Sequence, residues 1–178
     1  MAVHSDIRTG VLTVSDKASR GLREDESGEV AAGMLREQGF SVVQKAVVPD
    51  DGRTIADTLK AWVEEERLSL IVTSGGTGLS PTDVTPQAMV EVIDYEVPGM
   101  AEAMRAASLK ITPHAMISRA MAGVRGGCLI INLPGSPGGV RENLSVVLPA
   151  LPHALSKLGG DTTDCASPPS AEQDVADI

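Results

Sequence analysis

An apolar run that leads into a glycine-rich loop is the clearest chemical feature of the sequence. The segment reads Ile71-Val72-Thr73-Ser74-Gly75-Gly76-Thr77-Gly78. Glycines at a strand end let backbone N–H groups approach a phosphate closely, and the hydroxyls of Ser74 and Thr77 can donate hydrogen bonds to it. The loop is not a Walker loop, because no Lys follows Gly78, and it lacks the third glycine of the dinucleotide fingerprint. The alternative is a plain tight turn.

A second loop of the same character follows the last apolar run. It reads Asn132-Leu133-Pro134-Gly135-Ser136-Pro137-Gly138-Gly139 and leads into a predicted helix. Its N–H groups and the helix dipole favour an anion. The alternative is a loop that only caps the helix. Two such loops at strand ends predict a shared crevice in which backbone amides hold a phosphate, even in an acidic chain.

Carboxylates flank this predicted crevice. Asp50-Asp51 ends the second apolar run, and Asp83 follows the glycine-rich loop. Mg²⁺ prefers one or two carboxylates together with substrate phosphates, so Asp50 and Asp83 are candidate ligands of the metal that accompanies a nucleoside triphosphate. The alternatives are a turn at 49–52 and a residue that precedes a helix at Asp83. Ser15-Asp16, after the first run, either lines the same crevice or forms a helix cap or turn.

Several other functions are disfavoured. The net charge of −9 argues against a nucleic-acid groove, and one Trp, one Tyr and one Phe cannot build a base-stacking platform. Ser136 lacks the Gly-x-Ser-x-Gly elbow of hydrolases, because Pro134 occupies the first glycine position. The three His and two Cys show neither zinc spacing nor a disulfide pattern. We therefore expect a cytoplasmic protein, and the absence of a leader or a long apolar stretch disfavours membrane insertion.

Strands and helices alternate along the predicted domain. Buried strands are predicted at 7–15, 40–48, 68–74 and 128–133. Helices are predicted at 27–38 and 53–66. Two more are predicted within 85–109, with Thr85 as an N-cap and a break near Pro98-Gly99. The last helix is predicted from Val140, and Pro149 and Pro152 must kink or restart it. This order predicts an α/β domain at 1–160, with a mostly parallel sheet and helices on both faces. The polar, acidic segment 161–178 is predicted to be a disordered tail.

At these residues the chain resembles the molybdopterin adenylyltransferases of molybdenum-cofactor biosynthesis, which also occur as the N-terminal domain of gephyrin. The resemblance spans about 7–158 and includes Ser15-Asp16, Asp25 with Ser27-Gly28, Pro49-Asp50, Ser74-Gly75-Gly76-Thr77-Gly78, Asp83-Val84-Thr85-Pro86, Pro98-Gly99, Ser118-Arg119 and Asn132-Leu133-Pro134-Gly135-Ser136-Pro137. It implies a three-layer α/β sandwich, a homotrimer, and transfer of AMP from Mg-ATP to the terminal phosphate of molybdopterin, with hand-over to a molybdate insertase.

The resemblance also implies roles for individual residues. Asp50 and Asp83 match the two aspartates on which the family relies for Mg-ATP handling and catalysis. The Ser74–Gly78 and Pro134–Ser136 loops would hold the pterin phosphate and dithiolene side, with Ser136 orienting the acceptor phosphate. The chain departs from the family at three positions. Lys17 and Thr82 stand where Arg is common, and Glu26 stands where a basic residue is common. Less charge is then available to meet a triphosphate, so the alternative is a non-catalytic molybdopterin-binding paralogue of the same fold.

Overall fold

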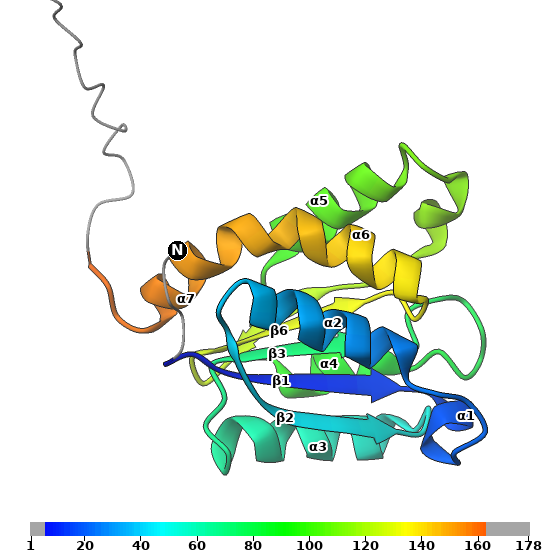
Figure 1. Cartoon of the computed structure of the whole chain (residues 1–178), viewed down its shortest axis with the longest axis horizontal. Helices are drawn as coiled ribbons and strands as arrows, with labels where there is room; N and C mark the ends of the chain where they lie inside the picture. The colour runs from blue at the N-terminus through cyan, green and yellow to red at the C-terminus, as the bar shows by residue number, and fades with distance from the viewer. Residues whose placement is uncertain (1–5, 163–178) are drawn as a thin grey trace, which may run out of the picture.

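A six-stranded sheet with helices on both faces forms the domain (Figure 1). The computed structural model describes residues 6–162. The strands are β1 (Arg8–Val14), β2 (Ser41–Val48), β3 (Leu70–Ser74), β4 (Tyr95–Glu96), β5 (Ala122–Arg125) and β6 (Cys128–Leu133). Their spatial order is β2-β1-β3-β6-β5-β4. The α/β fold predicted from the sequence is confirmed.

The helices form two outer layers. They are α1 (Asp16–Ser19), α2 (Glu26–Glu37), α3 (Gly52–Glu64), α4 (Thr85–Val92), α5 (Pro98–Ser108), α6 (Pro137–Val147) and α7 (Leu151–Leu158), with short 3₁₀ turns η1 (Pro113–Ile117) and η2 (Leu148–Ala150). Helices α2, α5, α6 and α7 contribute to a hydrophobic cluster on one face, which we call the α2/α6 cluster. Helices α3 and α4 contribute to a second, the α3/α4 cluster, on the other face.

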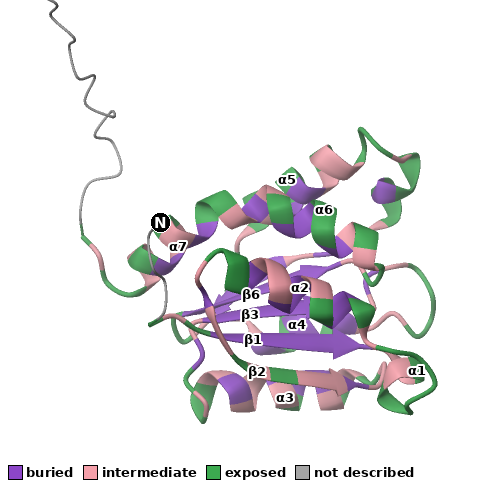
Figure 2. Ribbon diagram, in the orientation of Figure 1, coloured by how far each residue is buried: buried purple, intermediate pink, exposed green. Residues whose placement is uncertain are grey.

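The central strands are buried on both faces, as the purple strands of Figure 2 show. In β1, Val11 belongs to the α2/α6 cluster and its neighbour Leu12 to the α3/α4 cluster, and both are fully buried. Successive side chains of a strand point to opposite faces, so each strand supplies both clusters. This double burial explains why the sequence shows continuous apolar runs and not alternation.

The carboxyl ends of the three central strands lie side by side. Thr13 of β1 pairs with Ser74 of β3, which pairs with Leu133 of β6, and both pairings are parallel. The chain leaves β1 toward β2 on one side and reaches β3 on the other, so the strand order reverses between β1 and β3. Open α/β sheets bind ligands in the crevice outside such a reversal.

The sheet is mixed, because β5 pairs antiparallel with both β6 and β4. Strands β4 and β5 were not predicted. Both residues of β4, Tyr95 and Glu96, are exposed, and β5 is only 4 residues long. Hydrophobic periodicity cannot reveal such short or exposed strands.

Three predicted helix boundaries also shift. Thr85 is the first residue of α4 and not its N-cap, and its hydroxyl donates a hydrogen bond to the carbonyl oxygen of Gly75 (2.9 Å). Pro98 begins α5, as proline does well at a first helical position, so the break comes before it. The last helix starts at Pro137, before Val140, and the two later prolines interrupt it, as predicted, to give η2 and α7.

The end of the described region lies just beyond α7. Asp161 is still attached to this helix, because its carboxylate accepts a hydrogen bond from Ser156 Oγ (2.9 Å). The predicted disordered tail otherwise lies outside the described residues and stays a prediction. Within 6–162, no helix combines the length and apolar character that crossing a bilayer requires.

Candidate functional site

Two cavities open where the glycine-rich loops leave the sheet. The first, the carboxylate cavity, has a volume of about 620 Å³ and contains Asp50 and Asp83 in its wall. The second, the α5–η1 cavity, has a volume of about 450 Å³ and contains Ser108 and Ser118 in its wall. Ser136 lines both. The cavities are therefore neighbours that share one wall.

Asp50 is held at the end of β2 by a reciprocal pair of hydrogen bonds. Its Oδ2 accepts from the backbone N–H of Asp16 (2.8 Å), and its own N–H donates to Asp16 Oδ1 (3.2 Å). The pair connects the chain after β1 with the chain after β2. Asp16 thus serves the predicted site by orienting Asp50, and it does not itself line either described cavity.

Asp83 closes a tight loop that begins at Gly78. Its Oδ2 accepts a hydrogen bond from the backbone N–H of Ser80 (2.9 Å). A Cβ at Gly78 would lie only 2.8 Å from the same oxygen, so the glycine lets the carboxylate fold back against the loop. Oδ2 is thereby oriented by the loop's own backbone while Asp83 lines the carboxylate cavity.

Ser15 both caps a helix and lines the carboxylate cavity, so both interpretations of this residue hold. Its Oγ accepts from the N–H of Ala18 (3.2 Å) at the start of α1. Further acidic residues line the same cavity at the start of α2, namely Glu24, Asp25 and Glu26, with Arg23 as the basic residue among the described lining residues.

The glycine-rich loop requires two of its glycines. Gly75 has a φ of +102° and Gly76 a φ of +63°, values that residues with a Cβ rarely adopt. A Cβ at Gly75 would also lie 2.2 Å from the carbonyl oxygen of Val14. The loop can therefore pass directly over the end of β1, which brings Gly75 and Gly76 into the carboxylate cavity.

The second loop packs against the first. An ideal Cβ at Gly135 would lie 3.2 Å from Gly75 Cα, and the carbonyl oxygen of Gly135 accepts a hydrogen bond from Ser27 Oγ (2.7 Å). Ser136 caps α6, accepting from the N–H of Gly139 (3.1 Å). The loops after β3 and β6 therefore lie together, and residues of both loops line each cavity. The sequence predicted one shared crevice, and the structure has two cavities there.

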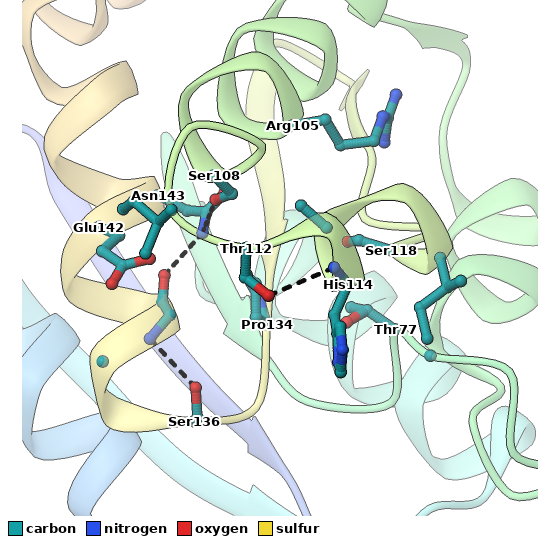
Figure 3. Close-up of a pocket in the computed structure, with 16 residues that line it drawn as sticks. Thr77, Arg105, Ser108, Thr112, His114, Ser118, Pro134, Ser136, Glu142 and Asn143 are labelled. Atoms are coloured by element: carbon teal, nitrogen blue, oxygen red, sulfur yellow. Dashed lines mark hydrogen bonds between the residues drawn. The ribbon is translucent and has the colours of Figure 1, made fainter.

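The α5–η1 cavity combines polar and apolar side chains (Figure 3). Asn143 of α6 donates to Ser108 Oγ of α5 (3.2 Å) and to the carbonyl oxygen of Gly139 (2.8 Å). Arg105 donates to the carbonyl oxygen of Ala120 (2.7 Å). Thr77, Gly78 and Pro134 of the two loops complete the wall, with Ile111 and Ile117 as apolar members.

Two predicted site residues lie beneath the loops. Ser74 is 1% exposed and Asn132 fully buried, and neither lines a described cavity. Asn132 donates to Thr73 Oγ1 (2.8 Å) across the sheet. Ser74 Oγ has no hydrogen-bond partner among the described residues, and its donation to a phosphate stays a prediction.

Most of the α5–η1 cavity was not predicted from the residues. His114 lines it with Ser108, Thr112 and Ser118. The stretch around them has no helical or strand periodicity, and several apolar side chains there are exposed, including 65% of Ile111 and 70% of Met116. In the sequence, the available signal was a set of apolar residues in a segment without helical or strand periodicity. Their exposure in the structure is typical of a binding surface.

The predicted magnesium ligands, Asp50 and Asp83, line the same cavity of the described structure. The described residues contain no group of three or more His, Cys, Asp or Glu side chains arranged for a metal. Mg²⁺ commonly uses one or two carboxylates plus phosphate oxygens, and Asp50 and Asp83 offer the carboxylates of that donor set.

The described cysteine, Cys128, is buried. Burial raises the pKa of its thiol to about 12, so this thiol stays protonated and is unsuited to nucleophilic chemistry.

Comparisons with known proteins agree with this geometry. The family model described as "Probable molybdopterin binding domain" matches residues 10–153. The chain is 40% identical over 157 residues to a molybdopterin adenylyltransferase of Helicobacter pylori strain 26695, covering 87% of this chain and 89% of that protein. It is 42% identical over 156 residues to gephyrin of Dictyostelium discoideum, covering 82% of this chain but only 22% of that longer protein.

A solved structure supports the same relationship. The molybdopterin biosynthesis enzyme MoaB of Thermus thermophilus is 51% identical, with a TM-score of 0.82, and the match covers 87% of this chain and 98% of that chain.

Proposed function

The chain belongs to the family of molybdopterin-binding domains of molybdenum-cofactor biosynthesis, and we propose that it is a molybdopterin adenylyltransferase. In this reaction a terminal phosphate oxygen of molybdopterin attacks the α-phosphorus of ATP. The bond between the α-phosphorus and the bridging oxygen breaks, and pyrophosphate leaves with that electron pair. The products are adenylyl-molybdopterin and pyrophosphate.

The observation that carries the proposal is the pair of cavities with a shared wall. Transfer between two bulky substrates is faster when the protein holds both with their reacting phosphates side by side, which two adjoining cavities allow. The wall consists of the loops after β3 and β6, whose backbone N–H groups and the N-terminus of α6 suit phosphate. Ser136, which lines both cavities, is positioned to orient the acceptor phosphate.

Each cavity suits one substrate. The α5–η1 cavity joins apolar side chains to serine and threonine hydroxyls and to Arg105, a combination that fits the planar, polar-edged pterin. The carboxylate cavity suits a nucleotide that arrives with Mg²⁺, because its acidic wall would otherwise repel a triphosphate. Mg²⁺, when held by Asp50 and Asp83, would neutralise charge on the phosphates. The two aspartates would orient the reacting α-phosphate relative to the shared wall.

The decisive measurement is pyrophosphate release from Mg-ATP by the purified protein, with and without molybdopterin. We expect release that requires the pterin. Binding of molybdopterin is measured in parallel by isothermal titration calorimetry. Tight pterin binding without pyrophosphate release would contradict the proposal and identify the chain as the non-catalytic paralogue.

Three wider features are proposed from the family resemblance. We expect a homotrimer, a cytoplasmic location and transfer of the adenylylated product to a molybdate insertase. Gephyrin of Dictyostelium, which is much longer than this chain and contains a matching region, is consistent with a further step carried out by another domain or protein.

A further inference from the structure

Arg119 joins the two ends of the loop that carries Asp83. Its backbone N–H donates to the carbonyl oxygen of Thr77 (2.8 Å), its Nε donates to that of Gly78 (2.7 Å), and its Nη2 donates to that of Asp83. Arg119 is half-buried and lines neither described cavity. It therefore acts on the site through the backbone of this loop.

Little else holds the loop in place. Its residues Leu79, Ser80, Pro81 and Thr82 are exposed, so side-chain packing contributes little. The internal bonds from Ser80 N–H to Asp83 Oδ2 and from Asp83 N–H to the Ser80 carbonyl shape the loop, but they do not attach it to the sheet. Thr85, which bonds to Gly75 and Gly76, and Val84, which packs against the α3/α4 cluster, attach the loop at its Asp83 end. Arg119 is the residue that bonds to both ends.

The geometry of the guanidinium suits this task. Its planar fork presents several N–H donors in fixed directions, so one side chain can bond to two carbonyls at once. Lysine carries the same charge as a compact ammonium on a flexible stem and cannot reproduce the fork. The contact thus depends on shape as well as on charge.

We propose that Arg119 is a positioning residue for the reaction: by bonding to the carbonyls of Gly78 and Asp83, it sets where the Asp83 carboxylate stands in the carboxylate cavity. The inference rests on the adenylyltransferase activity proposed above for its kinetic consequence. Its structural consequence, a loop that loosens without the guanidinium, can be measured independently of that activity.

A matched residue separates this role from general stabilisation. Arg125 of β5 also donates to a backbone carbonyl, that of Val92 (2.7 Å), and forms an ion pair with Glu64. It lines neither described cavity. Arg125→Lys therefore removes a comparable fork far from the carboxylates, and Arg119→Lys removes the one beside Asp83.

The experiment compares both variants with the wild type in steady-state kinetics and in hydrogen exchange followed by mass spectrometry. For Arg119→Lys we expect kcat to fall by about 100-fold, since small misplacements of a catalytic group have effects of that size. The dissociation constant for molybdopterin should change much less than kcat, because only Gly78 of the bonded pair lines the α5–η1 cavity. Amides at 78–84 should exchange faster. Arg125→Lys should keep the wild-type kcat and the wild-type exchange at 78–84.

Two results would overturn the inference. One is unchanged exchange at 78–84 in Arg119→Lys. The other is an equal loss of kcat in both variants, which would make Arg119 a general stabiliser. A wild-type protein that releases no pyrophosphate would instead refute the proposed activity, and the exchange measurement would still decide whether Arg119 holds the loop.

Discussion

Adjacent aspartates at the end of β2 have different partners and therefore different roles. Asp50 faces the carboxylate cavity and pairs with the chain after β1. Asp51 is exposed and caps α3, accepting from the N–H of Thr54 (2.8 Å) and from its hydroxyl (2.7 Å). The hydroxyl and the N–H of Thr54 hold the pKa of Asp51 below its usual range. The sequence motif Pro49-Asp50-Asp51-Gly52 thus contains one residue for the site and one for the turn.

Replacing each aspartate separately tests this division. Asp50→Asn should lower kcat for pyrophosphate release by about 1000-fold, because loss of transition-state charge stabilisation has effects of this order. Its unfolding midpoint should stay near the wild type, since Asn keeps an acceptor for the Asp16 N–H. Asp51→Ala should lower the midpoint and retain kcat. Steady-state kinetics and thermal unfolding check both, and equal kinetic losses would show that the two residues share one role.

The two loops that build the shared wall depend on close backbone contacts. Gly75 passes over the Val14 carbonyl, and Gly135 lies against Gly75. Both contacts occur where parallel strands end. The wall therefore depends on the register of these strands and on glycines, which have no side chain to separate the loops. This explains why the glycines belong to the architecture of the site as well as to its chemistry.

A glycine elsewhere provides the comparison. Gly75→Ala should destabilise the fold by about 3 kcal/mol, since it combines a left-handed backbone with a Cβ that meets a main-chain oxygen. Gly33→Ala, in α2 with nothing within 4 Å of the new Cβ, should stabilise it by about 0.5 kcal/mol. Urea unfolding of both variants measures the difference. A mild effect at Gly75 would mean that the loop can move away from β1.

The whole domain depends on one sheet with a cluster on each face. Because β1, β3 and β6 contribute side chains to both clusters, neither face can lose its packing without exposing the other. Trp62, the single tryptophan, belongs to the α3/α4 cluster and is 8% exposed. Its fluorescence reports on one face, and far-ultraviolet circular dichroism reports on all the helices.

When urea unfolding is monitored by Trp62 fluorescence and by circular dichroism, we expect the two transitions to coincide. Leu59→Ala in the α3/α4 cluster and Leu144→Ala in the α2/α6 cluster, both fully buried, should each cost about 3 kcal/mol. Both should shift the Trp62 transition and the circular dichroism transition together. A Trp62 transition that Leu144→Ala leaves unmoved would contradict a single cooperative unit.

The sequence by itself determined four strands, the helices between them and the two glycine-rich loops. The prediction that all four strands are buried was wrong for β2, which lies at the edge of the sheet and buries only Val48. Apolar runs indicate strands, and glycine-rich segments before helix-start residues indicate loops, so these features can be recognised without knowledge of distant contacts. The sequence also identified Asp50, after the second strand, and Asp83, after the glycine-rich loop, as candidate carboxylates, although each had an ordinary turn or cap as an alternative.

Only the tertiary structure decided which of these residues face open space. Ser74 and Asn132 resemble the other loop residues in type, yet parallel pairing places them inside the sheet, and Asp51 turns away while Asp50 turns in. The attachment of the Asp83 loop to Arg119 joins residues 36 and 41 positions apart. The second cavity lies between α5, η1, α6 and the loops after β3 and β6. Such contacts depend on how layers pack, and no local pattern of polarity or propensity encodes them.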